Sequence, residues 1–321
     1  MYYLANGLKT NAIENTHPFF IQECENVPHS GNTRFSFPQD SIFYDLDSEC
    51  ISLCDHFLKK IFPDVDEYYR LLPSSPIWAT DAGHNSDFDI EKEQLERLIQ
   101  GVKDEWLFRQ LFYADCTNLI GYLQSRIMGA KDKFVLFYVN LGNYEPFLLE
   151  TMKDGVIWAS GEGTTTIFSL LTDLITNLYS ILDITTKIAY QIENIPSDFK
   201  TYPRLKSSMQ YGNYKQLRRI NFDGTVFEGN HPTLKLIENL RHELIHNGYW
   251  EAIPKLYFRI ENGIVNEKWI YMPDEINGNL VASHNRKRFF AQGIKINDRL
   301  PVICDDFWKR LLKTVLPLKS I

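Results

Sequence analysis

The chain has 321 residues, of which 44% are hydrophobic and 23% are charged, and its formal net charge is −7. These values are close to those of ordinary globular proteins, so they exclude an intrinsically disordered chain and a fibrous one. The length is sufficient for one large domain or two ordinary ones.

The negative charge is concentrated in the first third of the chain. Residues 1–105 hold 8 Lys and Arg against 19 Asp and Glu, which leaves the rest of the chain with a net charge of +4. An anionic ligand is therefore expected in the later part. The acidic part is expected to act as a regulatory or specificity layer.

The cysteines and the apolar stretches indicate a reducing, cytoplasmic environment. The five cysteines have no paired metal-ligand spacing, and Cys50 and Cys54 are predicted to be buried thiols rather than half of a zinc site. The N-terminus lacks a basic start followed by an apolar run, so no secretory signal is predicted. Polar residues interrupt the stretch 167–182, which predicts that it does not span a bilayer.

The first 130 residues are predicted to form an acidic, mostly helical region. Residues 1–45 have no steady period and are expected to be irregular or to form a short covering layer. Apolar residues at helical spacing predict helices over 48–62 and from 90 to about 128, separated by a loop at 71–87.

A small antiparallel β segment is predicted over residues 131–160. Three short apolar runs, KFVLFYVNL, EPFLLETM and DGVIWAS, are divided there by Gly-Asn and Asp-Gly. Such dipeptides between apolar runs are typical of hairpin turns.

Residues 161–321 are predicted to form a helical domain with a hairpin. A long helix is expected from about 166 to 195, and another from Pro232 to Asn247. Proline suits the first helical position, and the Asn247-Gly248 pair supplies a stop. Alternation around Asn262-Gly263 predicts a hairpin over 256–272, and an amphipathic helix ends the chain.

A basic segment, residues 200–219, contains no carboxylate. It is either a solvated surface or, with its interleaved tyrosines, a surface that follows RNA phosphates and stacks bases. The candidate RNA-binding residues are Lys200, Arg204, Lys206, Lys215, Arg218 and Arg219.

The second predicted helix carries Arg241, followed directly by the polar His242 and, after four intervening residues, by His246. This pattern resembles the motif of the HEPN superfamily ribonucleases: an Arg, four to six residues, then a His. Residues 178–192 resemble the first helix of that superfamily's up-and-down bundle. The resemblance covers about 166–250, extends at most to 316, and does not involve residues 1–130.

The resemblance implies a mainly α fold, in which a HEPN-like helical bundle with small hairpin insertions follows a helical N-terminal region. It also implies metal-independent cleavage of RNA by its own 2′-OH, without a cofactor. His246 would move the proton, Arg241 would stabilise the charge on the phosphorane, and Asn247 would bind phosphate. The implied partners are RNA, a second copy that completes the active site, and a protein antitoxin or regulator, as for a toxin or defence effector.

Helical spacing places Arg241 at the edge of an apolar face, where a guanidinium requires a partner. Asp183 on the preceding long helix is the candidate. Each residue also has a structural alternative: Arg241 as an ion-pair partner, His246 bonded to helix carbonyls, Asp183 paired with Lys187, and Asn247 as a helix stop.

Two other functions stay open. The domain could be an inactive HEPN scaffold that binds RNA, a nucleotide or a protein. It could also be a metalloenzyme that uses Glu238, His242 and His246, because two histidines at i,i+4 can bind a divalent metal.

Overall fold

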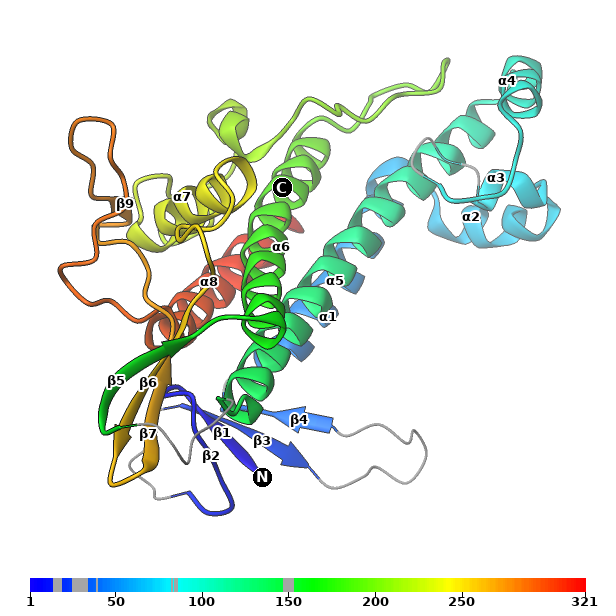
Figure 1. The fold of residues 1–321 in the computed structure, drawn as a ribbon. Helices are drawn as coiled ribbons and strands as arrows, with labels where there is room; N and C mark the ends of the chain where they lie inside the picture. The colour runs from blue at the N-terminus through cyan, green and yellow to red at the C-terminus, as the bar shows by residue number, and fades with distance from the viewer. Residues whose placement is uncertain (14–18, 25–33, 39, 82, 84–85, 147–152) are drawn as a thin grey trace. The chain divides into compact units, whose positions relative to one another are not determined.

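The computed structural model describes residues 1–321 except 14–18, 25–33, 39, 82, 84–85 and 147–152 (Figure 1). The structure is about 54% helical and about 13% strand. The prediction of a mainly α fold is therefore confirmed.

The chain forms two compact units, each built from three separate stretches. Unit 1 comprises Met1–Tyr44, Ile127–Tyr179 and Glu228–Leu311. Unit 2 comprises Asp45–Arg126, Ser180–Phe227 and Leu312–Ile321. The predicted sequential boundaries at 130 and 160 do not match these units, because shifts in composition follow chain order whereas compactness follows packing between distant segments.

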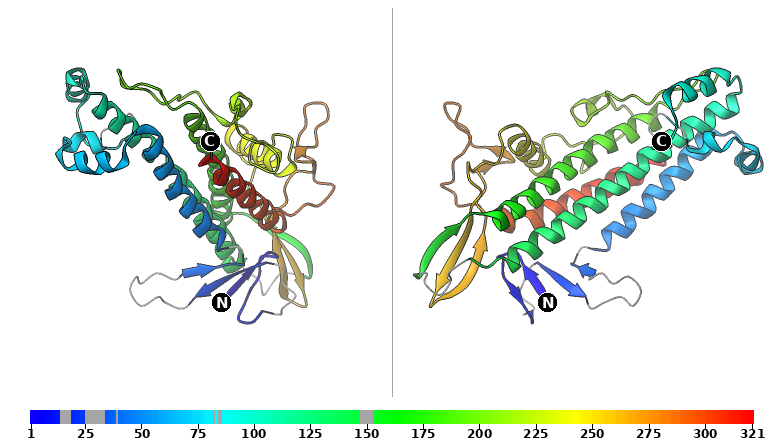
Figure 2. Two further views of the ribbon diagram at one scale, coloured as in Figure 1. Left: turned by 180° about the vertical axis from the view of Figure 1, so that it is seen from behind. Right: turned by 45° about the vertical axis from the view of Figure 1, so that its right-hand side comes forward.

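Unit 1 begins with a four-stranded antiparallel sheet in the order β2-β1-β3-β4, visible as blue arrows in Figure 2. Its strands are β1 (Tyr2–Leu4), β2 (Lys9–Thr10), β3 (Phe20–Cys24) and β4 (Arg34–Ser36). Of the two alternatives predicted for residues 1–45, the irregular one was wrong for these strands. The strands have two to five residues, too few for alternation to be visible in the sequence.

The predicted strand over KFVLFYVNL is helical in the structure. It belongs to α5 (Glu105–Asn143). Phe134, Phe137, Tyr138 and Leu141 are buried at i, i+3, i+4 and i+7, which is the spacing of one helix face. The aromatic and β-branched composition suggested a strand, but the spacing decides the structure. Most of the run EPFLLETM lies outside the described residues.

The third apolar run forms β5 (Gly155–Ala159), which pairs with a strand about a hundred residues later. The three-stranded sheet has the order β5-β6-β7, with β6 (Leu256–Glu261) and β7 (Ile264–Trp269) joined at Asn262-Gly263. Both turn residues have positive φ, 54° and 73°, as a two-residue hairpin requires. The predicted hairpin is confirmed. A second small hairpin contains β8 (Glu275–Ile276) and β9 (Asn279–Leu280).

The three helices predicted in the later part are confirmed with shifted ends. They are α6 (Glu162–Glu193), α7 (Pro232–His246) and α8 (Ile296–Leu318). By length and composition α6 could span a bilayer, contrary to the prediction. A core helix can have the same length and composition, and 44% of the apolar 18-residue stretch of α6 is buried inside the protein.

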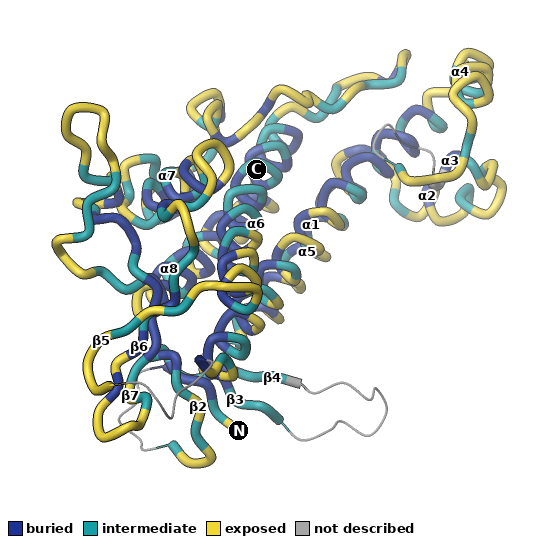
Figure 3. The backbone as a smooth tube through the Cα atoms, viewed as in Figure 1, coloured by how far each residue is buried: buried dark blue, intermediate teal, exposed yellow. Residues whose placement is uncertain are grey.

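Unit 2 contains α1 (Ile42–Ile61, of which the first three residues belong to unit 1), α2 (Val65–Leu71), the 3₁₀ helix η1 (Leu72–Ser74), α3 (Ile77–Asp81), α4 (Lys92–Gly101) and η3 (Tyr211–Gln216). The predicted loop at 71–87 thus contains two short helices. The predicted helix from 90 to 128 is divided between α4 and α5. Figure 3 shows the buried and exposed turns of these elements.

Helical spacing in the sequence predicts that Ile51, Cys54, Phe57 and Leu58 form the buried face of α1. Phe57 and Leu58 are buried as predicted and Cys54 is half-buried, but Ile51 is exposed, and Cys50 and Leu53 are buried instead. All five cysteines are free. Burial raises the pKa of Cys50 to about 12 and that of Cys54 to about 11, so these thiols stay protonated at neutral pH.

Lys268 of β7 is a buried lysine that binds the end of α5. Its Nζ donates hydrogen bonds to the backbone carbonyls of Gly142 at 2.8 Å and Tyr144 at 2.6 Å. Burial lowers the pKa of Lys268 from its ordinary value of 10.5 to about 8.

We therefore predict a pH-dependent difference in stability between the wild type and Lys268→Met. Between pH 8 and pH 10.5 the unfolded chain binds more protons than the folded chain at this position, so wild-type stability should rise relative to the variant as pH increases. Chemical denaturation of both proteins from pH 7 to pH 10 measures this difference. Parallel pH profiles would contradict the prediction.

Candidate functional site

The predicted pair lies at the carboxyl end of α7. This helix starts at Pro232 and is followed by Gly248 with a φ of +70°, as the sequence predicted. The helix buries an apolar arc formed by Leu234, Leu236, Ile237, Leu240 and Leu244. Arg241 is half-buried at the edge of this arc, and His246 is exposed.

Arg241 and His246 are in direct contact. Nη1 of Arg241 lies 3.2 Å from Nε2 of His246. A guanidinium has only donors, so a hydrogen bond between these two atoms requires the tautomer of His246 whose Nε2 is the acceptor. The arrangement places a fixed cation and a proton acceptor at one point of the surface.

The aromatic ring of Tyr179 supports the guanidinium of Arg241. The Arg241 Cζ lies 5.1 Å from the ring centroid, a cation–π distance. Asp183, the predicted partner, accepts a hydrogen bond from the backbone N–H of Tyr211 at 2.7 Å within unit 2. A pair between Asp183 and Arg241 would join the two units and stays a prediction.

His242 extends the polar face of α7. Its ring centroid is 4.9 Å from that of His246, and both side chains are exposed. Within the described part of the chain, no three or more His, Cys, Asp or Glu side chains gather to hold a metal ion. Glu238 therefore does not complete a metal site with these histidines.

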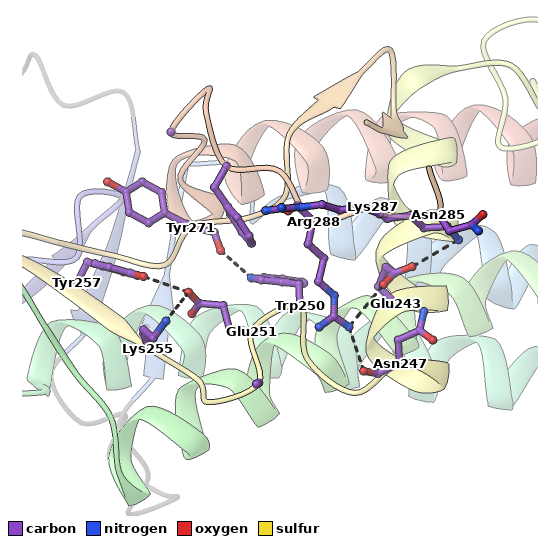
Figure 4. Close-up of a pocket in the computed structure, with 14 residues that line it drawn as sticks. Glu243, Asn247, Trp250, Glu251, Lys255, Tyr257, Tyr271, Asn285, Lys287 and Arg288 are labelled. Atoms are coloured by element: carbon purple, nitrogen blue, oxygen red, sulfur yellow. Dashed lines mark hydrogen bonds and ion pairs between the residues drawn. The ribbon is translucent and has the colours of Figure 1, made fainter. Parts of the chain in front are cut away.

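A cavity of about 1180 Å³ lies beside the end of α7 (Figure 4). Glu243, Asn247 and Trp250 line it, together with side chains from the hairpin and from residues 285–293. Arg241, His242 and His246 are not among its lining residues. α7 thus carries His242 and His246 outside the cavity, while Glu243 and Asn247 at the same end line it.

Glu243 organises this cavity. It is 3% exposed, and its carboxylate lies 3.8 Å from Lys287 Nζ and 3.9 Å from Arg288 Nη2. Arg288 Nη2 also donates to the backbone carbonyl of Asn247 at 3.2 Å. Asn247 ends the helix, and its backbone carbonyl holds the guanidinium of Arg288 at the cavity.

The sequence analysis missed the basic cluster Arg286, Lys287 and Arg288. The signal was present, because residues 276–297 contain no carboxylate while three consecutive cations stand among them. All three line the cavity. The preceding His284 and Asn285 have positive φ, 50° and 66°, which turns the chain toward α7.

The predicted basic segment 200–219 lies in unit 2. Its six cationic side chains are exposed. The carboxylate of Glu193 accepts the backbone N–H groups of Arg218 at 2.8 Å and Arg219 at 2.7 Å, which attaches the segment to the end of α6. Arg204 and Lys206 line a groove, whereas Lys200, Lys215, Arg218 and Arg219 are not among its lining residues.

One of the three tyrosines of this segment is buried, and the other two are half-buried. Tyr211 is buried and donates to the carbonyl of Val226 at 2.9 Å. Tyr202 is half-buried and donates to Asp115 at 2.6 Å. Tyr214 stacks on Tyr211 with the ring centroids 5.4 Å apart. The expectation of alternating cations and stacking rings was wrong for Tyr211, since the apolar bodies of tyrosines stabilise the core.

Comparison with known proteins identifies no relative: no family model, no curated protein and no solved structure matches this chain. The resemblance to HEPN ribonucleases therefore depends on the motif in α7 and on the helices around it.

We predict that Glu243→Gln lowers the free energy of unfolding by about 1–2 kcal/mol, because Lys287 and Arg288 lose their buried counter-charge. It should also speed tryptic cleavage after these two residues. Denaturant titration and timed proteolysis measure the two effects. Glu238→Gln, an exposed glutamate on the same helix, is the control and should change neither. Equal behaviour of both variants would contradict the role of Glu243.

Proposed function

We propose that this protein is a metal-independent endoribonuclease of HEPN type. The observation that carries the proposal is the 3.2 Å contact between Nη1 of Arg241 and Nε2 of His246 at the end of α7. The helical segments 162–193, 232–246 and 296–318 would be the bundle of such a domain. The activity would be that of a cytoplasmic toxin or defence effector.

The chemistry requires a proton acceptor beside a fixed positive charge. When a phosphodiester binds, the guanidinium of Arg241 turns its donors to the phosphate oxygens, and Nε2 of His246 becomes able to accept the 2′-OH proton. The 2′-oxygen attacks phosphorus, and Arg241 stabilises the charge on the phosphorane. The 5′-oxygen leaves with a proton, giving a 2′,3′-cyclic phosphate and a 5′-OH.

A second protomer would complete the groove for RNA. The pair lies on an exposed face and does not line the cavity beside α7, so one chain encloses little of a substrate at that point. His242, whose ring lies 4.9 Å from His246, is suited to supply the second proton transfer. Two copies that meet at this face would bring together two sets of Arg241, His242 and His246.

An inactive scaffold that binds RNA, a nucleotide or a protein is the second candidate. The observation that favours it is the same exposed position: a surface pair outside a cavity can bind an anion without excluding the water that competes with catalysis.

We predict that purified protein cleaves single-stranded RNA in EDTA and leaves the all-deoxy analogue intact, because DNA lacks the internal nucleophile. His246→Ala should reduce the cleavage rate by about 100-fold or more, and Arg241→Ala by about 100-fold. A fluorogenic oligoribonucleotide measures the rate, and circular dichroism checks the fold.

His284→Ala is the matched control, since His284 is an exposed histidine of the same unit. It should retain wild-type activity. RNA binding without cleavage by the folded wild type would favour the scaffold, and cleavage that survives His246→Ala would exclude the proposed mechanism.

A further inference from the structure

A groove in unit 2 has the features of a ligand site that the ribonuclease proposal does not use. It has a volume of about 740 Å³ and lies between residues 119–126 of α5, residues 184–191 of α6 and the loop 204–207. This volume is within the range of small-molecule sites.

The groove gathers positive charge. Arg126, Lys187, Arg204 and Lys206 line it, and no carboxylate is among its lining residues. In the described part of the chain, Lys187 and Arg204 have no carboxylate within ion-pair distance. The positive charges of Lys187 and Arg204 therefore repel each other, and a bound anion relieves that repulsion.

The loop that carries two of these cations is held in place by side-chain contacts. Lys206 Nζ lies 4.7 Å from the ring centroid of Tyr190 and 3.4 Å from Oε1 of Gln216. These contacts hold the ammonium group of Lys206 in place before a ligand binds, which reduces the conformational entropy lost on binding.

A buried, unsatisfied donor provides an independent indication of a ligand. Gln191 lines the groove, is 3% exposed, and its Nε2 has no hydrogen-bond partner among the described residues. A buried amide N–H without an acceptor costs about 1–3 kcal/mol. An oxygen of a ligand in the groove would accept this hydrogen bond.

Part of the remaining wall, which also includes Ser125 and Ser207, is apolar and carries an aromatic ring. Leu119, Ile184 and Leu205 line it, and so does Tyr122, whose side chain is 44% exposed. A simple inorganic anion would leave this wall in contact with water, whereas a flat ring would cover it. The site thus combines donors for phosphate with a surface for an aromatic body.

We propose that this groove binds a nucleoside polyphosphate. Lys187 and Arg204 bind the phosphates, the apolar wall and Tyr122 contact the base, and Gln191 Nε2 donates to an oxygen of the ligand. The proposal is independent of RNA cleavage, because its residues lie in the other unit and its test is equilibrium binding.

The test is isothermal titration calorimetry of the full chain with ATP and GTP, with inorganic triphosphate and a 12-residue single-stranded RNA as comparison ligands. At least one nucleotide should bind, and tighter than inorganic triphosphate. Lys187→Ala and Arg204→Ala should each weaken it about tenfold. The control Lys103→Ala, an exposed cation of the same unit outside the groove, should leave affinity unchanged.

Gln191→Met separates a binding role from a structural one. It removes the unsatisfied donor at similar size, so the melting temperature should stay the same or rise while nucleotide affinity falls about tenfold. The proposal would be overturned if neither nucleotide bound at millimolar concentration or if only the RNA bound. It would also be overturned if inorganic triphosphate bound as tightly as the nucleotides, or if Gln191→Met and Arg204→Ala kept wild-type affinity.

Discussion

The burial of one face of α7 is the constraint on which the candidate site depends. Once its leucines and Ile237 are buried, the rotation of the helix about its axis is fixed. Arg241 then falls at one edge of the buried arc and Glu243 at the other. The histidines are left on the exposed side. No single polar residue sets this arrangement; the apolar contacts do.

This rotation gives two polar surfaces different chemistry. On one, Arg241 contacts His246 and the ring of Tyr179, and no carboxylate is among the partners that the structure gives for the guanidinium. On the other, Glu243 is buried opposite Lys287 and Arg288. The first surface combines a cation with a proton acceptor, which suits phosphate chemistry. The second surface has more cations than carboxylates, and Glu243 holds there the chain that returns past the end of the helix.

Cations that are close together in the sequence do not all lie on one surface in the structure. The basic segment 200–219 was predicted as one surface, but its backbone is fixed by Glu193 and its cations are divided between the groove and open solvent. The groove gains Arg126 and Lys187 from two helices that are far away in the sequence. The cations of the groove therefore come from three segments that no single window of the sequence contains.

The sequence by itself determined the elements whose signals are local. The i+4 leucines, the Pro232 start and the Gly248 stop defined α7, and Asn262-Gly263 defined the hairpin, because these preferences act over a few residues. The sequence also placed Arg241 and His246 near the end of this helix, but an i,i+5 pair lies about 140° apart around the axis, so only the structure shows their side-chain contact. For residues 133–141 the residue types predicted a strand, but their apolar residues have helical spacing and the segment is part of α5.

Only the tertiary structure decided which distant residues meet. The pairing of β5 with β6, the position of Glu243 against residues 287–288, and the unsatisfied Gln191 among cations of three segments depend on packing between parts of the chain that local preferences do not relate. The physical reason is that burial is a property of the assembled core. The sequence of a segment shows which residues are apolar, but not which residues of other segments pack against them.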